Sequence, residues 1–131
     1  MFHRASHVLL AATLVPVIAA AQAPPTREQL GVPAYPGATY DARNSDGMSQ
    51  EREKYYIFTT ADDLPQVVAF YERATQRRGT EMGGAVLIAI VGSGPFPTHG
   101  VMIERNRQGM YPAAVRTVIT VRRELSEEGE P

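Results

Sequence analysis

The chain has 131 residues, a formal net charge of -1 and no cysteine. Its length suits a single domain, and a composition of 44% hydrophobic and 21% charged residues allows a packed core. The near-neutral charge gives no reason to expect nucleic acid as a partner. The absence of cysteine excludes disulfides, thiolate metal sites, a cysteine nucleophile and lipid attachment to a cysteine.

The first residues have the three-part pattern of a secretory signal peptide. Arg4 gives a short basic start, Val8–Ala20 is a run without charge, and small residues follow. The run is short for a bilayer span, so no stable membrane span is expected once the signal is removed. Cleavage is expected after Ala21, with Ala23 as the alternative. We therefore predict an exported protein, periplasmic or secreted, whose signal peptide covers residues 1–21.

A polar stretch with two prolines follows, and residues 22–31 are expected to form a linker. Pro36 and Gly37 suit the central positions of a type II turn, because proline presets the first and glycine accepts the positive φ of the second. A first strand is expected near residues 38–42. The turn thus marks the entry into the domain, which is expected to span residues 32–124.

Turn residues at Asn44–Gly47 separate this strand from a second one within Glu51–Thr60, whose buried face alternation does not assign. An amphipathic helix begins after Asp63, which forms a capping-box pattern with Gln66. Gly79 suits the position just past the helix end. The apolar face of the helix carries Leu64, Val67, Val68 and Tyr71, with Phe70 beside them.

Three more strands are expected after the helix. Ala85–Val91 is apolar without alternation, which favours a strand buried on both faces. A short strand at Val101–Arg105 follows, and Ala114–Arg123 alternates between apolar and polar residues. Residues 125–131 are expected to be an unfolded acidic tail.

The sequence therefore predicts an α+β fold in the order β-β-α-β-β-β, with one amphipathic helix on an antiparallel sheet of four to five strands. One helix covers only one face of that sheet. The other face needs the N-terminal segment, a loop or a second copy of the protein. A homodimer through the sheet face around Ala85–Val91 is therefore a candidate assembly.

Four residues are candidate ligand-binding positions, and no catalytic residue is assigned. His99 lies in the proline- and glycine-rich stretch Gly92–Gly100 and is interpreted as an exposed loop residue. Arg116 and Arg122 belong to a group of arginines that could meet anionic partners, although a solvated sheet face is the preferred interpretation. Tyr71 is a candidate for lining a pocket between helix and sheet. No metal site and no cofactor are expected.

Two motifs of the chain have a family resemblance. The turn YPGAT and the helix DDLPQVVAFYERA, with its VxxFY pattern at Val67–Tyr71, resemble small exported bacterial proteins of uncharacterised function. Such proteins often have a tryptophan after the helix glycine, where this chain has Thr80. The resemblance covers roughly residues 33–75 and implies an exported domain with one helix on a sheet. It implies no activity.

We expect a non-enzymatic binding or interaction protein of the cell envelope. The alternatives are a small hydrolase-like enzyme using His99 and a small-ligand carrier with a pocket between helix and sheet. The hydrolase requires an acid within hydrogen-bonding reach of His99. The carrier requires an apolar cavity beneath Tyr71.

Overall fold

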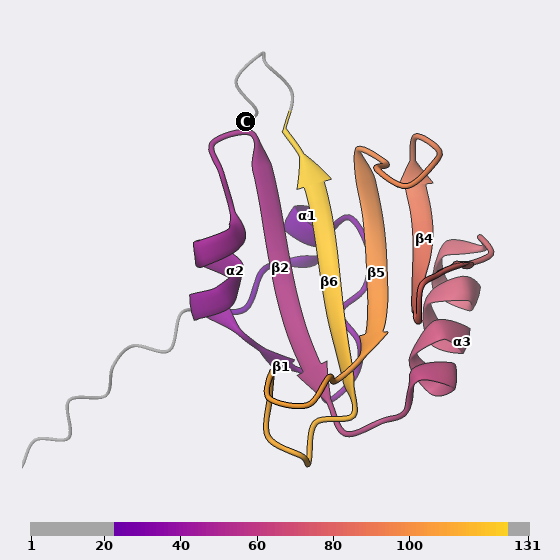
Figure 1. Ribbon diagram of the computed structural model, residues 1–131. Helices are drawn as coiled ribbons and strands as arrows, with labels where there is room; N and C mark the ends of the chain where they lie inside the picture. The colour runs from indigo at the N-terminus through magenta and orange to yellow at the C-terminus, as the bar shows by residue number, and fades with distance from the viewer. Residues whose placement is uncertain (1–22, 126–131) are drawn as a thin grey trace, which may run out of the picture.

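The computed structural model describes residues 23–125, which form one antiparallel sheet of six strands and three helices (Figure 1). The strands lie in the order β1-β2-β6-β5-β4-β3. The α+β class is confirmed, but the sheet has more strands than expected and two additional short helices. The bounds are α1 Arg27–Leu30, β1 Thr39–Tyr40, α2 Ala42–Met48, β2 Glu53–Thr60, α3 Leu64–Thr75, β3 Thr80–Met82, β4 Ala85–Val91, β5 His99–Arg105 and β6 Thr117–Glu124.

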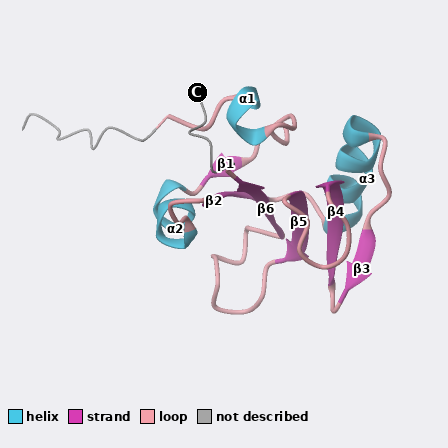
Figure 2. Ribbon diagram, turned by 90° about the horizontal axis from the view of Figure 1, so that it is seen from above, coloured by secondary structure: helices cyan, strands magenta, loops and turns pink. Residues whose placement is uncertain are grey.

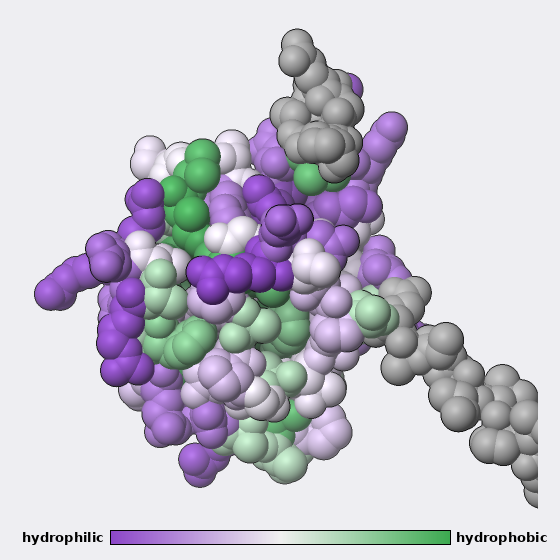
Figure 3. Space-filling view, turned by 180° about the vertical axis from the view of Figure 1, so that it is seen from behind, coloured by the Kyte–Doolittle hydropathy of each residue, from purple (hydrophilic) through white to green (hydrophobic). Residues whose placement is uncertain are grey.

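The two faces of the sheet are covered differently. Helices α1 and α3 lie on one side, called the helix face below, and α2 lies on the other, called the second face (Figure 2). Seen from outside, the helix face is a mixture of polar and apolar surface, with the most hydrophobic patch near the top of the view (Figure 3). Strand alternation sends one set of apolar side chains into the core beneath α1 and α3. That core contains Leu30, Val32, Tyr35, Phe58, Leu64, Val67, Tyr71, Ile88, Val101, Ile103, Ile119 and Val121.

Helix α3 begins where the sequence predicts it. The Asp63 side chain accepts from the Gln66 backbone N–H, and the Gln66 side chain accepts from the backbone N–H of Asp63. The helix ends earlier than expected, because Gln76 adopts a left-handed conformation with φ 54°. Gly79 has another role: a Cβ there would lie 2.3 Å from Cγ1 of Val86, so only glycine lets the chain pass this close to β4.

The stretch expected to be a linker belongs to the fold from Thr26 onward. Thr26 and Gln29 form a capping box at the start of α1, and Leu30 is only 1% exposed. Gly31 ends the helix with φ 69°. The guanidinium of Arg123 donates to the carbonyl oxygens at the helix end, at 2.8 Å for Glu28 and 3.0 Å for Gln29. The linker prediction is wrong here because tertiary contacts order a segment whose composition looks like a loop.

The stretch expected to be a turn at Asn44–Gly47 lies inside α2, which Asp41 caps. This helix covers the part of the β2 edge that the two-residue strand β1 leaves unpaired. The buried Ser45 hydroxyl accepts from the backbone N–H of Ile57 at 2.8 Å, and that of Ser49 accepts from Tyr55 at 3.0 Å. The turn prediction is wrong because these bonds outweigh the weak helix propensity of the segment.

Two local predictions are confirmed. The Ala38 N–H donates to the carbonyl oxygen of Tyr35 at 3.1 Å, and Gly37 has φ 77°, as a type II turn requires. Strand β4 has the predicted bounds, and its first four residues are buried within the single chain. The alternation of β2 is now assigned as well: Phe58 faces the helix-face core, and Tyr55, three residues earlier, faces the second face.

The remaining domain limits fall outside what the structure describes. The signal peptide expected at residues 1–21 and nearly all of the tail expected at 125–131 lie outside residues 23–125. Leu125 is described, and its backbone N–H donates to the carbonyl oxygen of Arg52 at 2.7 Å.

Candidate functional site

A groove of about 260 Å³ lies on the second face of the sheet. Alternation places Tyr55, Leu87, Met102 and Thr120 on this face, so four adjacent strands supply its floor. Helix α2 and the loop 92–98 stand on either side of it. The groove is lined by Met48, Tyr55, Leu87, Pro95, Phe96, Pro97, Gly100, Met102, Glu104, Thr120 and Arg122.

The loop 92–98 rests directly on β5 at Gly100. A Cβ at this position would lie 2.8 Å from Cγ of Pro97 and 3.3 Å from the carbonyl oxygen of Ile88. Any larger residue would therefore lift the loop away from the sheet. Glycine here sets the height of one wall of the groove.

Two large apolar side chains at the rim of the groove are exposed to solvent. Phe96 is 83% exposed and Met48 is 49% exposed. The floor residues Met102 and Thr120 are half-buried. Isolated exposed apolar side chains are ordinary, but a pair flanking an apolar groove is typical of a binding surface.

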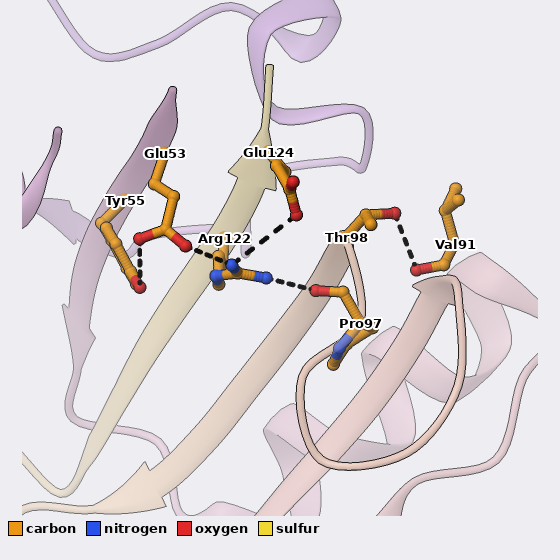
Figure 4. A network of polar contacts seen from close by, with 7 residues as sticks. All are labelled: Glu53, Tyr55, Val91, Pro97, Thr98, Arg122 and Glu124. Atoms are coloured by element: carbon orange, nitrogen blue, oxygen red, sulfur yellow. Dashed lines mark hydrogen bonds and ion pairs between the residues drawn. The ribbon is translucent and has the colours of Figure 1, made fainter. Parts of the chain in front are cut away.

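Arg122 fastens one end of the groove (Figure 4). Its guanidinium donates to the carbonyl oxygen of Pro97 and to the Glu53 carboxylate, and lies 3.8 Å from a carboxylate oxygen of Glu124. The hydrogen bond to Glu53 raises the pKa of the guanidinium. Arg122 thus ties the loop 92–98 to β2 and β6, and its donors are committed to the protein itself.

Glu104 lies at the other end of the groove in a different environment. Its cross-strand neighbours are Ala85 and Val118, which are both buried and have no side-chain donor. Among residues 23–125, no hydrogen-bond donor or cation contacts its half-buried carboxylate. A carboxylate among apolar neighbours loses hydration without a compensating partner.

His99 is not the exposed loop residue that the sequence suggested. It is the first residue of β5, is 7% exposed, and its Nε2 lies 2.8 Å from the carbonyl oxygen of Leu30. Burial lowers the pKa of the imidazole, with nearby Arg123 acting in the same direction. In the described chain no carboxylate hydrogen-bonds to the ring. The visible contact of His99 therefore holds α1 on the sheet.

Tyr71 and Arg116 also lie away from the groove. Tyr71 is fully buried, with its ring edge-on to Phe70 at a centroid distance of 5.0 Å and close to Tyr35. Among residues 23–125 no group is placed to hydrogen-bond its hydroxyl, and burial raises the pKa of that hydroxyl. Arg116 is exposed at the end of the loop 106–116. Of the four sequence candidates, only Arg122 lines the groove.

The described residues contain no group of three or more His, Asp or Glu side chains placed to hold a metal ion. Among residues 23–125, no helix is long and apolar enough to cross a membrane. The arginines of β6 do not gather on one face, because Arg122 and Arg123 project to opposite faces of the strand.

Comparisons with known proteins give no relative for this chain. No family model matches it, and neither a curated protein nor a solved structure matches it. The resemblance to small exported bacterial proteins therefore stays a prediction. The groove is therefore the feature of the molecule that bears on function.

The sequence did not single out most of the groove residues. Met102 and Glu104 belong to a strand that was predicted, and their alternation with Val101 and Ile103 was the available signal for a second face. Nothing local marks Met48 or Phe96, because their positions depend on where α2 and the loop 92–98 dock.

Proposed function

We propose that this chain is a small, exported, non-enzymatic binding protein of the cell envelope, and that its ligand site is the groove on the second face. The observation that carries the proposal is the apolar floor between two exposed rim residues, Phe96 and Met48. An open apolar groove with a few polar groups at its ends suits an apolar ligand.

The construction of the groove supports a binding role. Its floor belongs to the sheet, which packs against the core on its other side, so the site is mounted on a rigid element. Its lining contains two methionines, Met48 at the rim and Met102 on the floor, whose flexible side chains adapt to ligands of different shape. The wall at Pro97 is tied down by Arg122.

The size of the groove favours a small ligand over a second copy of the chain. The reason to expect a homodimer was that a second copy would bury the second face of Ala85–Val91. Ala85 and Leu87 are already buried within one chain, so a second copy is not needed to cover them. Size-exclusion chromatography with light scattering should give a monomer; a stable dimer dispersed by Phe96→Ala would make the groove a subunit interface.

A titration with a neutral apolar probe tests the proposal. We expect 1-hexanol to shift amide NMR signals of groove residues in the ¹⁵N-labelled protein, and we expect Phe96→Ala to weaken these shifts severalfold. Val91→Ala is the matched control, because Val91 is also exposed but does not line the groove. Shifts spread over the whole surface, or equal effects of the two variants, would overturn the proposal.

Export is proposed on the signal-peptide pattern alone. Mass spectrometry of the protein recovered outside the cytoplasm should find an N-terminus at Gln22, or at Pro24 if cleavage follows Ala23. An intact Met1 would contradict cleavage.

A further inference from the structure

We propose that the groove binds an organic cation: a ligand with an apolar body and an ammonium group that Glu104 recognises. This inference rests on the proposed function, since it names the ligand class of the same groove. The occupant is a small amphipathic amine, and a neutral or anionic apolar ligand should bind less tightly.

The charge of the second face supports a cationic ligand. Alternation places four charged strand residues on this face among the described residues, three carboxylates and one guanidinium. Arg122 is the guanidinium, and it already contacts two of the carboxylates. Glu104 is left over, so the charged strand residues of this face carry a formal excess of negative charge. The four residues are Glu53, Glu104, Arg122 and Glu124.

The position of Glu104 makes its carboxylate available to a ligand. It lines the groove, and both cross-strand neighbours are apolar. A ligand ammonium here would provide the charge-assisted partner that the carboxylate lacks. The carboxylate is half-buried, so water screens such a contact less than it screens a fully exposed pair.

The shape of the groove fixes the orientation of the ligand. Gly100 and Glu104 are separated along β5 by about 13 Å, from the ~3.3 Å rise per residue of a strand. Phe96 and Pro97 lie over the Gly100 end, and Glu104 lies at the other. An alkyl or aromatic body therefore fits beneath the loop 92–98, with the ammonium directed towards Glu104.

Arg122 does not favour an anionic or zwitterionic ligand. Its guanidinium already donates to the Pro97 carbonyl and to Glu53, with Glu124 nearby. A ligand carboxylate would have to displace these contacts.

Three probes of the same length test the proposal on the folded protein: hexylammonium, 1-hexanol and hexanoate. NMR titration at low salt should give hexylammonium the highest affinity, about fivefold above hexanol, which corresponds to one partly exposed charge contact. Hexanoate should be the weakest. Raising the salt to 1 M should reduce the preference, because salt screens the charge contact and not the apolar one.

Glu104→Gln should abolish the preference for hexylammonium over hexanol while leaving hexanol binding unchanged. Glu81→Gln is the matched control, because Glu81 is an exposed strand glutamate on the helix face and should change nothing. If all three probes bind equally at the groove, or if Glu104→Gln keeps the preference, the cation proposal is wrong and the binding function stands. If none of them shifts groove signals, the proposed function itself fails.

Discussion

The two faces of the sheet are built on different principles. On the helix face, α3 and the N-terminal segment bury a continuous set of apolar side chains, and Ile119 at its centre is 0% exposed. On the second face the neighbouring residue Thr120 is only half-buried and lines a groove. The helix face carries the main hydrophobic core, and the second face keeps an incompletely filled surface, the groove for which we propose a ligand.

Polar contacts hold the segments that cover the second face. The hydroxyls of Ser45 and Ser49 attach α2 to β2, and Arg122 attaches the loop 92–98. Asn106 holds the loop 106–116, donating to the carbonyl oxygens of Tyr111 at 3.1 Å and Val115 at 2.9 Å. Directional bonds of this kind position a covering segment without needing to fill the space beneath it.

The largest expected effect separates the two faces at adjacent positions of β6. Ile119→Ala should lower the free energy of unfolding by about 3 kcal/mol, because it removes buried methyl groups and leaves a cavity. Thr120→Ala, the matched control on the second face, should cost only about 0.5 kcal/mol. Urea denaturation followed by circular dichroism measures both values. Similar losses would show that the second face is as tightly packed as the helix face.

A second prediction concerns the hydroxyl that holds α2. Ser45→Ala should lower the free energy of unfolding by about 2 kcal/mol, because the backbone N–H of Ile57 loses its acceptor in a buried position. Ser93→Ala changes a serine in the exposed loop and should stay within about 0.5 kcal/mol of the wild type. If the two variants unfold at the same urea concentration, α2 is not held by Ser45.

The comparison of the two faces also shows which parts of the structure can be predicted from the sequence. The start of α3, the turn at Pro36 and the bounds of β4 were predictable, because each depends on local backbone preferences or an apolar run. Helix α2 was not, since its segment favours a turn locally and becomes helical through bonds from Ser45 to a strand twelve residues away. The groove forms only where α2 and the loop 92–98 both dock on the sheet, and local sequence patterns do not predict such docking. The sequence therefore identified Arg122 only as one arginine of a group.

A third prediction tests the polar clamp on the loop 92–98. Arg122→Lys keeps the charge but loses the planar fork that reaches both Pro97 and Glu53. We expect about 1 kcal/mol of lost stability and faster amide hydrogen exchange in the loop, with the helix face unaffected. Arg105→Lys is the control at an exposed strand end. Unchanged exchange in the loop would contradict the role assigned to Arg122.

The smallest effect is expected at the seam between α1 and the helix face, where His99 contacts the Leu30 carbonyl. Burial lowers the pKa of the folded imidazole below its ordinary 6.5, so the unfolded chain takes up a proton first as the pH falls. The stability that neutral His99 contributes is therefore complete above about pH 6.5 and declines as the pH falls below that value, until the folded ring is protonated too.

His99→Gln tests this pH dependence, because it keeps an N–H donor near the Leu30 carbonyl and removes the titration. Melting temperatures at pH 7.5 and 5.5 should differ more for the wild type than for this variant. Carboxylates titrate mostly below this window, and His99 is the only histidine in residues 23–125, so an equal drop in both proteins would mean that the ring is not buried against α1.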